Sequence, residues 1–142
     1  MQLIEKKMNL FDADDKYYFA HCISSDAALG AGIAKEFQKR FRLRDKIIAK
    51  IKEYPLGYYP KCILIGKVFN LVTKKYYYNK PTYNSLKLSL QEMNIYCISK
   101  SIKYLAIPKL GCGLDKLQWG KVREIIQEVF VDTDIEILVC YL

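Results

Sequence analysis

Short apolar runs alternate with longer segments of helical periodicity along nearly the whole chain. Alternation of this kind is typical of a layered α/β domain, in which helices cover a central sheet. With 142 residues and 51% hydrophobic side chains, the chain is long enough for one domain with a buried core and too short for two. We therefore expect a single domain over residues 1–142. The predicted strands are Gln2–Lys7, Tyr17–Ile23, Cys62–Ile65, Val68–Thr73, Tyr104–Ile107 and Ile135–Tyr141.

Between these strands, apolar residues three and four apart predict three helices. Thr82 is a favourable N-cap for the second helix, and Asp115 with Gln118 forms a capping-box pattern that predicts Asp115 as the cap of the third. The first helix is expected to bend or break around Arg42–Asp45. Gly66 and Lys67 join two predicted strands in a tight hairpin, for which a type II′ turn suits Gly at the first position. The predicted helices are Gly32–Lys52, Tyr83–Lys100 and Leu117–Phe130.

Basic side chains outnumber acidic ones by 23 to 15, which gives a formal net charge of +8. This excess favours anionic partners such as nucleotides, nucleic acids or phospholipid headgroups, and charge alone does not choose among them. No apolar run approaches the roughly 20 residues of a bilayer span, and the N-terminus lacks the apolar core of a signal peptide. We expect no membrane association and no targeting module, and an intracellular protein, cytoplasmic or, in a eukaryote, nuclear.

The five cysteines are odd in number, widely spaced and mostly set in apolar segments, as free core thiols are. No Cys-x-x-Cys pair exists, and the only histidine, His21, lies inside a predicted strand, where a structural role is favoured. The acidic cluster of Asp12, Asp14 and Asp15 lacks the glycine and glutamate spacing of an EF-hand and reads as a solvated loop. We expect no disulfide, no metal and no cofactor.

Two glycine-containing loops each lie between a predicted strand and a predicted helix, the edge at which open α/β sheets bind ligands. The first contains Gly30 and Gly32 just ahead of a helix N-terminus, where free N–H groups attract anions. The second contains Gly111 and Gly113. Each could be only a tight turn, but two such loops at one sheet edge could together cradle a diphosphate.

A third loop, Tyr76–Thr82, contains three consecutive tyrosines and Lys80. The tyrosines could stack on a base or ribose, although tyrosines at strand ends more often pack against neighbours. Judged alone, Lys80 is one solvated lysine among many. Judged alone, Asp115 is better explained as a helix cap than as a reactive group.

The three loops, taken in order, resemble a known family. His21-Cys22-Ile23-Ser24, Gly30-Ala31-Gly32-Ile33-Ala34, Lys80-Pro81-Thr82-Tyr83 and Pro108-Lys109-Leu110-Gly111-Cys112-Gly113-Leu114-Asp115 are similar to segments of macrodomains of the terminal ADP-ribose protein glycohydrolase type. Antitoxin macrodomains that reverse DNA ADP-ribosylation are relatives of that type. The likeness extends from Asn9 to the final strand. It implies a three-layer α/β/α macrodomain sandwich with a mixed, mostly parallel central sheet, which binds ADP-ribose in a cleft at the strand ends.

The resemblance also implies roles for particular residues. Lys80 and Asp115 would be the catalytic pair, the first glycine loop would approach the distal ribose, and the second would contact the diphosphate. Asn9 stands where many macrodomains carry an aspartate that accepts from the adenine amino group, and its amide oxygen can still accept that bond. Tyr141 and Leu142 would form an apolar wall beside the adenine base. The implied ADP-ribose ligands are Asn9, Leu10, Ser24, Gly30, Gly32, Ile33, Gly111, Cys112, Gly113, Leu114 and Leu142.

The chemistry implied is removal of mono-ADP-ribose from acidic residues of proteins or from nucleobases of DNA, the latter a repair reaction. The Lys80 amine would attack the anomeric carbon, and Asp115 would assist proton transfer and release of the lysine adduct. Lys74, Lys75 and the helix beginning near Thr82 are expected to place positive charge near Lys80. Deacetylation of O-acetyl-ADP-ribose is a related possibility.

Two other functions stay open from sequence. A binding module could recognise ADP-ribose without turnover, since the two glycine loops would suffice for it. A nucleic-acid-binding protein could instead use the basic helix from Lys35 to Lys52. For the hydrolase, we expect a monomer with ADP-ribose as ligand and product, and ADP-ribosylated protein or DNA as substrate.

Overall fold

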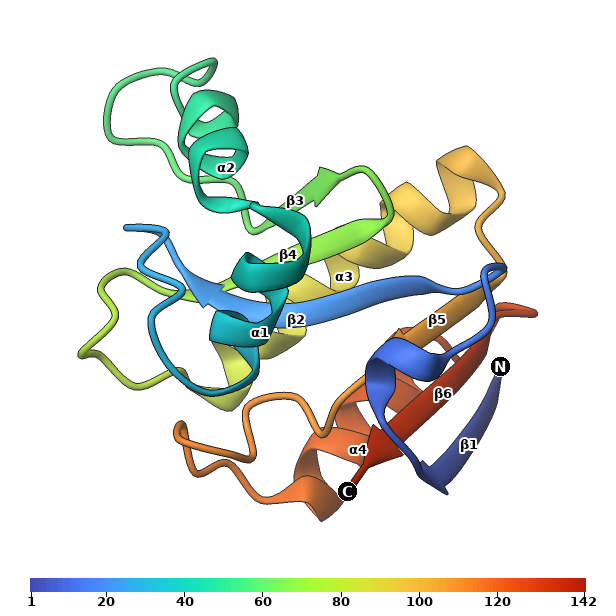
Figure 1. Ribbon diagram of the computed structural model, residues 1–142. Helices are drawn as coiled ribbons and strands as arrows, with labels where there is room; N and C mark the ends of the chain where they lie inside the picture. Colours follow the sequence, from blue (N-terminus) through green and yellow to red (C-terminus); the bar gives the residue numbers. More distant parts are fainter.

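The computed structural model describes residues 1–142 and shows three layers, with helices on both faces of a six-stranded sheet (Figure 1). The strand order is β1-β6-β5-β2-β4-β3, and every neighbouring pair is parallel except the antiparallel pair β3 and β4. The expected α/β/α sandwich with a mixed, mostly parallel sheet is confirmed. The strands are β1 (Gln2–Lys7), β2 (Tyr18–Ser24), β3 (Cys62–Ile65), β4 (Val68–Lys74), β5 (Tyr104–Ile107) and β6 (Glu136–Tyr141).

Four α-helices and one 3-10 helix cover the sheet. One face packs against α1, α2 and the 3-10 helix η1, and the other packs against α3 and α4. None of the helices has the length and apolar character that crossing a bilayer requires. The helices are η1 (Leu10–Asp12), α1 (Gly32–Phe41), α2 (Arg44–Ile51), α3 (Tyr83–Lys100) and α4 (Trp119–Val129).

Strand β6 shows how one apolar run serves both cores. Side chains alternate across a strand, so Ile137 and Val139 pack with α3 and α4, while Leu138 and Cys140 pack with α1 and η1. All four are at most 7% exposed. A strand buried on both faces reads in sequence as a continuous apolar run, as this one does.

Local signals placed most element boundaries correctly. Thr82 caps α3, because its side chain accepts from the backbone N–H of Ser85 at 2.9 Å. The expected break in the first helix falls at Arg42, whose φ of 51° is left-handed and separates α1 from α2. The hairpin of β3 and β4 turns at Gly66, which has φ of 57°. These three predictions are confirmed.

The predicted cap of the third helix is wrong. Helix α4 begins at Trp119 rather than Leu117, and its N-cap is Gln118, which makes no side-chain capping bond. Residues 111–117 instead fold on themselves: the Leu117 N–H donates to the Gly111 carbonyl at 2.8 Å, and Lys116 is left-handed with φ of 61°. The Asp115 carboxylate is therefore free for a contact outside its own loop.

A register shift marks the end of strand β4. Ile23 of β2 lies opposite Val72 of β4, but the next residue, Ser24, lies opposite Lys74. Two residues of β4 thus face one of β2, as in a β-bulge. The shift lies at the carboxyl edge of the sheet.

His21 is structural, as predicted. Its ring is fully buried and stacks on Phe37 with centroids 4.0 Å apart. Asn70 donates its amide to the carbonyls of Ile63 and Val68, so its oxygen accepts from Nε2 of His21 at 2.6 Å. Burial lowers the pKa of His21 to about 4, although the Asn70 bond opposes that shift. The ring is neutral at physiological pH.

Candidate functional site

A cleft of about 1200 Å³ runs along the carboxyl edge of the sheet. The parallel strands all end at this edge, so the residues that follow them line the cleft in the order of the strands. Asn9 follows β1, Tyr141 ends β6, Pro108 follows β5, Ser24 ends β2 and Lys74 ends β4. Segments far apart in sequence thus meet in one groove.

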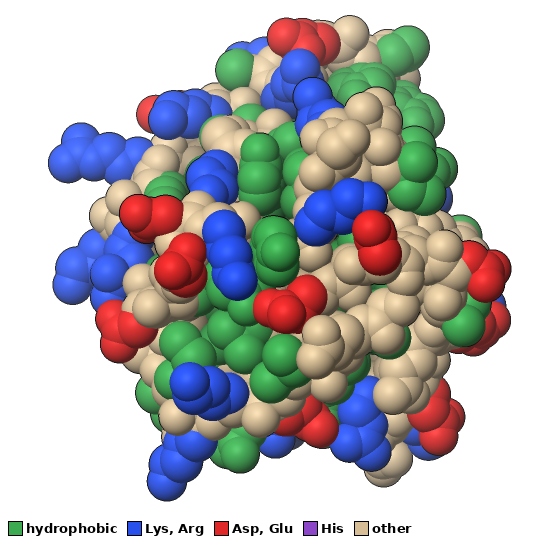
Figure 2. Space-filling model, turned by 90° about the vertical axis from the view of Figure 1, so that its right-hand side faces the viewer, with side chains coloured by type: hydrophobic (Ala, Val, Ile, Leu, Met, Phe, Trp, Pro, Cys, Tyr) green, Lys and Arg blue, Asp and Glu red, His purple; other side chains and the backbone are tan.

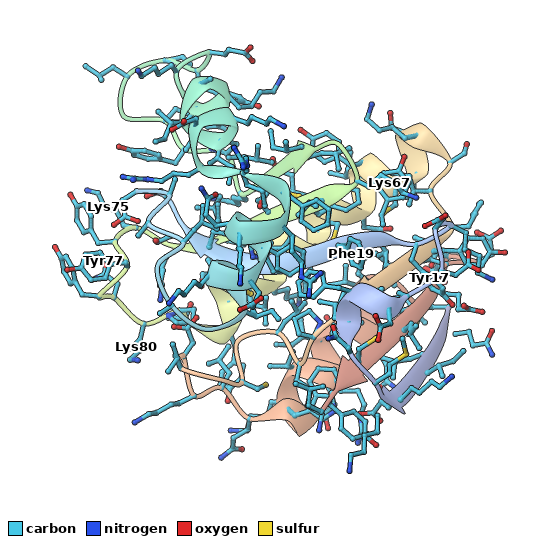
Figure 3. The ribbon with its side chains drawn as sticks, viewed as in Figure 1. Tyr17, Phe19, Lys67, Lys75, Tyr77 and Lys80 are labelled. Carbon is cyan, nitrogen blue, oxygen red and sulfur yellow. The ribbon has the colours of Figure 1, made fainter.

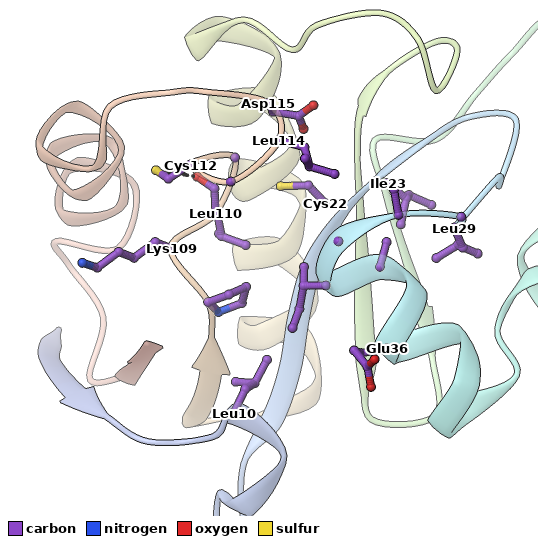
Figure 4. Close-up of a pocket in the computed structure, with 18 of the residues that line it drawn as sticks. Leu10, Cys22, Ile23, Leu29, Glu36, Lys109, Leu110, Cys112, Leu114 and Asp115 are labelled. Atoms are coloured by element: carbon purple, nitrogen blue, oxygen red, sulfur yellow. Dashed lines mark hydrogen bonds between the residues drawn. The ribbon is translucent and has the colours of Figure 1, made fainter. Parts of the chain in front are cut away.

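The cleft brings together every residue that the sequence predicted for the site. Lys80 and Asp115 lie on its wall with the predicted ligand residues of both glycine loops and both chain ends. Figure 4 shows Leu114 and Asp115 at one end, Leu10 at the other, and Cys22 between them. The predicted lining residues are Asn9, Leu10, Ser24, Gly30, Gly32, Ile33, Lys80, Gly111, Cys112, Gly113, Leu114, Asp115 and Leu142.

The two glycine loops require glycine at one position each. Gly32 and Gly111 have left-handed φ values of 58° and 71°. A Cβ on Gly111 would lie 2.7 Å from Cδ1 of Leu117, and one on Gly32 would lie 3.3 Å from Cδ1 of Leu114. Leu114 of the second loop therefore rests against the backbone of the first, and the two loops meet over the cleft.

Lys80 and Asp115 lie at the same end of the cleft. The Nζ of Lys80 donates to the carbonyl oxygen of Leu114 at 2.9 Å, next to Asp115 in the chain. The Lys80 side chain is exposed to solvent, whereas Asp115 is only 15% exposed. The arrangement places an accessible amine beside a sheltered carboxylate.

Lys74 contacts Asp115 directly, which the sequence analysis missed. The Nζ of Lys74 lies 2.8 Å from Oδ1 of Asp115, and the two side chains are 14% and 15% exposed. Lys74 was expected to supply free positive charge near Lys80, but that charge is paired. Lys75 points its amine over the ring of Tyr76, 5.3 Å from the centroid. No local sequence signal reveals an ion pair between residues 41 positions apart.

Two cysteines line the same end of the cleft. Burial, reinforced by the negative charge of Asp115, raises the pKa of Cys22 to about 12. Burial also raises the pKa of Cys112. Because the thiolate is the reactive form of cysteine, burial disfavours both thiols as nucleophiles.

Comparison with known proteins shows the family to which the chain belongs. No protein-family model matches the chain. Human ADP-ribose glycohydrolase OARD1 is 40% identical over 134 residues, covering 94% of this chain and 87% of the human protein, and the cattle protein matches equally well. The chain belongs to the ADP-ribose glycohydrolase macrodomains.

Solved structures agree with this fold. The DarG macrodomain of Mycobacterium tuberculosis superposes with a TM-score of 0.82 at 19% identity, covering 99% of this chain and 98% of that one. The DarG macrodomain of Thermus aquaticus gives 0.78 at 22% identity, covering 99% of both chains. Thermosipho africanus DarTG, solved in complex with ADP-ribose, gives 0.72 at 20% identity, covering 98% of this chain and 41% of that one.

Asn9 of this macrodomain has a structural bond that the sequence analysis did not foresee. Its side-chain oxygen accepts from the Phe11 N–H at 2.9 Å and caps η1. Phe11, in turn, lies beneath the guanidinium of Arg40, 4.3 Å from the ring centroid. At the same end, Lys109 lies over the ring of Tyr141 at 4.6 Å. Two cation–aromatic pairs therefore frame this end of the cleft, and sequence spacing indicated neither.

Asp26 organises the first glycine loop. Its carboxylate accepts from the Ser24 hydroxyl, from the Ala28 N–H at 3.3 Å and from the Tyr77 N–H at 3.0 Å. Burial opposes ionisation of Asp26, but these hydrogen bonds outweigh it and lower its pKa. Two residues of the loop, Ala27 and Leu29, are buried in left-handed conformations, with φ of 54° and 48°. Asp26 thus holds a strained loop and ties it to the segment that carries the tyrosines.

Proposed function

We propose that this macrodomain is an ADP-ribosyl hydrolase that removes mono-ADP-ribose from acidic residues of proteins or from nucleobases of DNA. The observation that carries the proposal is the placement of Lys80 and Asp115 at one end of a cleft whose middle is formed by two glycine loops. The named activity of human OARD1 and the ADP-ribose bound by Thermosipho DarTG support it.

The glycine loops suit a diphosphate. Gly32 lies at the N-terminus of α1, where unpaired N–H groups and the helix dipole attract anions. Gly111 and Gly113 allow the second loop to approach phosphate oxygens closely. Bound between them, ADP-ribose would place its adenine toward Asn9 and Leu142 and its distal ribose toward Lys80.

The reaction then proceeds through the Lys80 amine. Its lone pair attacks the anomeric carbon of the distal ribose, the bond to the carboxylate or base breaks, and the leaving group departs. Asp115 accepts the proton that the amine loses. Water then hydrolyses the lysine adduct, which frees ADP-ribose and restores the amine. The hydrogen bond from Lys80 to the Leu114 carbonyl orients the amine, because a neutral amine can donate one N–H and keep its lone pair free.

Release of ADP-ribose from an ADP-ribosylated glutamyl peptide tests the proposal. Wild type should release it, whereas Lys80→Ala, Lys80→Arg and Asp115→Ala should lose about two orders of magnitude or more in rate. Lys80→Arg is the matched control for charge, since arginine stays protonated and cannot attack. The lysine adduct can open its ribose ring to an imine, so borohydride reduction during turnover should trap ADP-ribose on Lys80, detectable by mass spectrometry.

Binding separates the hydrolase from a non-catalytic reader of ADP-ribose. If wild type binds ADP-ribose by calorimetry and releases none from modified substrates, the chain is a reader and the hydrolase proposal is wrong. Full activity of Lys80→Ala would instead remove only the lysine-adduct route. Parallel assays on a modified peptide and on modified guanine or thymine in DNA determine the substrate class.

A further inference from the structure

The turn between β4 and α3 presents three aromatic rings to solvent. Tyr76, Tyr77 and Tyr78 are 41%, 66% and 66% exposed, and Tyr77 also lines the cleft. Figure 3 shows Lys75, Tyr77 and Lys80 along one side of the molecule, at the carboxyl edge of the sheet, away from Tyr17 and Lys67. Neither the fold nor the hydrolase mechanism requires exposed rings here, so they call for another explanation.

The turn is rigid rather than loose. The Tyr76 N–H donates to the Asn79 side chain at 2.9 Å, and the Asn79 N–H donates back to the Tyr76 carbonyl at 3.0 Å. The Tyr77 N–H is fixed by Asp26. The rings of Tyr76 and Tyr78 stack, 5.4 Å between centroids and 12° from parallel. Ordering these rings on a partner therefore costs little entropy, which favours their use in binding.

Positive charge lies beside the rings. Lys75 lies over Tyr76, and Lys80 follows the turn. Helix α1 begins just after the loop that Asp26 ties to this turn, and residues 35–52, which include most of α1 and all of α2, carry eight basic residues against two acidic ones. On the face shown in Figure 2, by contrast, acidic and basic side chains are interspersed. The basic residues are Lys35, Lys39, Arg40, Arg42, Arg44, Lys46, Lys50 and Lys52, and the acidic ones are Glu36 and Asp45.

We propose that the tyrosine turn, residues 75–78, is a docking platform for the unpaired bases of a single-stranded nucleic acid. Bases stack on exposed aromatic faces while lysines meet the phosphates, the combination that single-strand binders use. In a duplex the base faces are already stacked on one another and cannot reach a turn of this kind. An acidic peptide would use the lysines and leave the rings without a partner.

The platform extends the proposed function. One consequence, the placement of a modified base at Lys80, rests on that function. A base attached to the distal ribose must leave the helix stack to bring the anomeric carbon to Lys80. The stacked rings of Tyr76 and Tyr78 lie on the segment that leads to Lys80, so the outer face of this stack would hold a base that flanks the modified one. Binding of unmodified single strands requires no turnover and stands independently.

Fluorescence anisotropy with an unmodified oligothymidylate tests the platform. Wild type should bind it, more weakly as salt rises, and the double variant Tyr76→Ala/Tyr78→Ala should bind about fivefold or more weakly. Tyr76→Phe/Tyr78→Phe keeps both rings and should bind as wild type does. Tyr104→Ala is the matched control, because Tyr104 is 37% exposed and begins β5, at the end of the strands away from the cleft. Unchanged ADP-ribose binding by the double alanine variant shows that the cleft is intact.

Three outcomes would overturn the platform. They are no oligothymidylate binding by wild type, equal binding by the double alanine variant, and tighter binding of a duplex or of a glutamate-rich peptide. The platform and the hydrolase can fail separately. Oligothymidylate binding without release of ADP-ribose contradicts only the hydrolase, and release from a modified peptide without oligothymidylate binding contradicts only the platform.

Discussion

Lys74 and Asp115 are joined by an ion pair of 2.8 Å that links the end of β4 to the second glycine loop. The pair fixes the carboxylate beside the Leu114 carbonyl, to which Lys80 donates. The position of the proposed general base is thus set by a strand on the far side of the cleft, not by its own loop.

Replacing Lys74 by methionine should lower kcat while leaving ADP-ribose affinity nearly unchanged, because Asp115 loses its orienting partner. Stability should fall by about 1–3 kcal/mol, since the pair is sheltered and Asp115 is left uncompensated. Lys87→Ala is the control: its pair with Glu128 is more exposed and should contribute less than about 1 kcal/mol. Denaturant unfolding and steady-state kinetics measure both. An unchanged kcat in the methionine variant would remove the positioning role of Lys74.

Gly111→Ala should weaken ADP-ribose binding and lower the melting temperature. The left-handed backbone costs alanine about 1–2 kcal/mol, and its Cβ would press on Leu117. Gly120→Ala is the matched control, because Gly120 lies in α4 outside the cleft and a Cβ there meets nothing within 4 Å. Calorimetric titration with ADP-ribose measures both variants. Equal losses from the two substitutions would contradict this account of the loop.

Asp26→Asn should raise KM more than it lowers kcat, because the first glycine loop loses a charged acceptor for its hydrogen bonds. It should also destabilise the fold in a pH-dependent way. A carboxyl whose folded pKa is lowered stabilises the fold above its unfolded value, about 3.9, and the benefit disappears as pH falls through the folded value. The stability gap between wild type and variant should therefore close in acid. A gap that is constant from neutral pH into acid would refute the role of the ionised carboxylate.

The ring of His21 should not titrate near neutrality. It is the only histidine, so its resonances are unambiguous, and they should stay constant from pH 8 to about 5. Its Nδ1 is buried without a partner, so protonation would bury an unmatched N–H. Because the unfolded chain binds this proton at about pH 6.5 and the fold only near 4, stability falls as pH drops between those values. A midpoint near 6.5 would contradict the described burial.

Most of the fold could be predicted because its determinants are local. Short apolar runs located the strands, and Thr82, Gly66 and the break at Arg42 depend on a few neighbouring residues. The cap assigned to Asp115 failed for the opposite reason. Its sequence pattern suited a capping box, but Lys74, distant in sequence, takes the carboxylate, and the loop closes through Gly111 instead.

The residues of the candidate site fall into the same two groups, those with local sequence signals and those placed by distant contacts. The glycine loops, Lys80 and Asp115 stand in recognisable motifs, so the sequence located them. Lys74, Asp26 and the pair of Phe11 with Arg40 act through contacts between segments that only the folded chain brings together. Asn9 lines the cleft, but its bond to Phe11 depends on the start of a 3-10 helix that the sequence did not indicate.

The register shift at the end of β4 decides which lysine meets Asp115. Under strict alternation Lys74 would point the same way as Val72, whose side chain packs on the core of α1 and α2. The extra residue breaks the alternation where Lys74 turns to the carboxylate. Deleting Thr73 would remove the bulge and leave Lys74 opposite Ser24, on the side of the sheet that it already faces. An even ladder that kept Thr73 would instead pair Thr73 with Ser24 and turn Lys74 away from Asp115. One extra residue, outside both glycine loops, therefore keeps the ion pair in place.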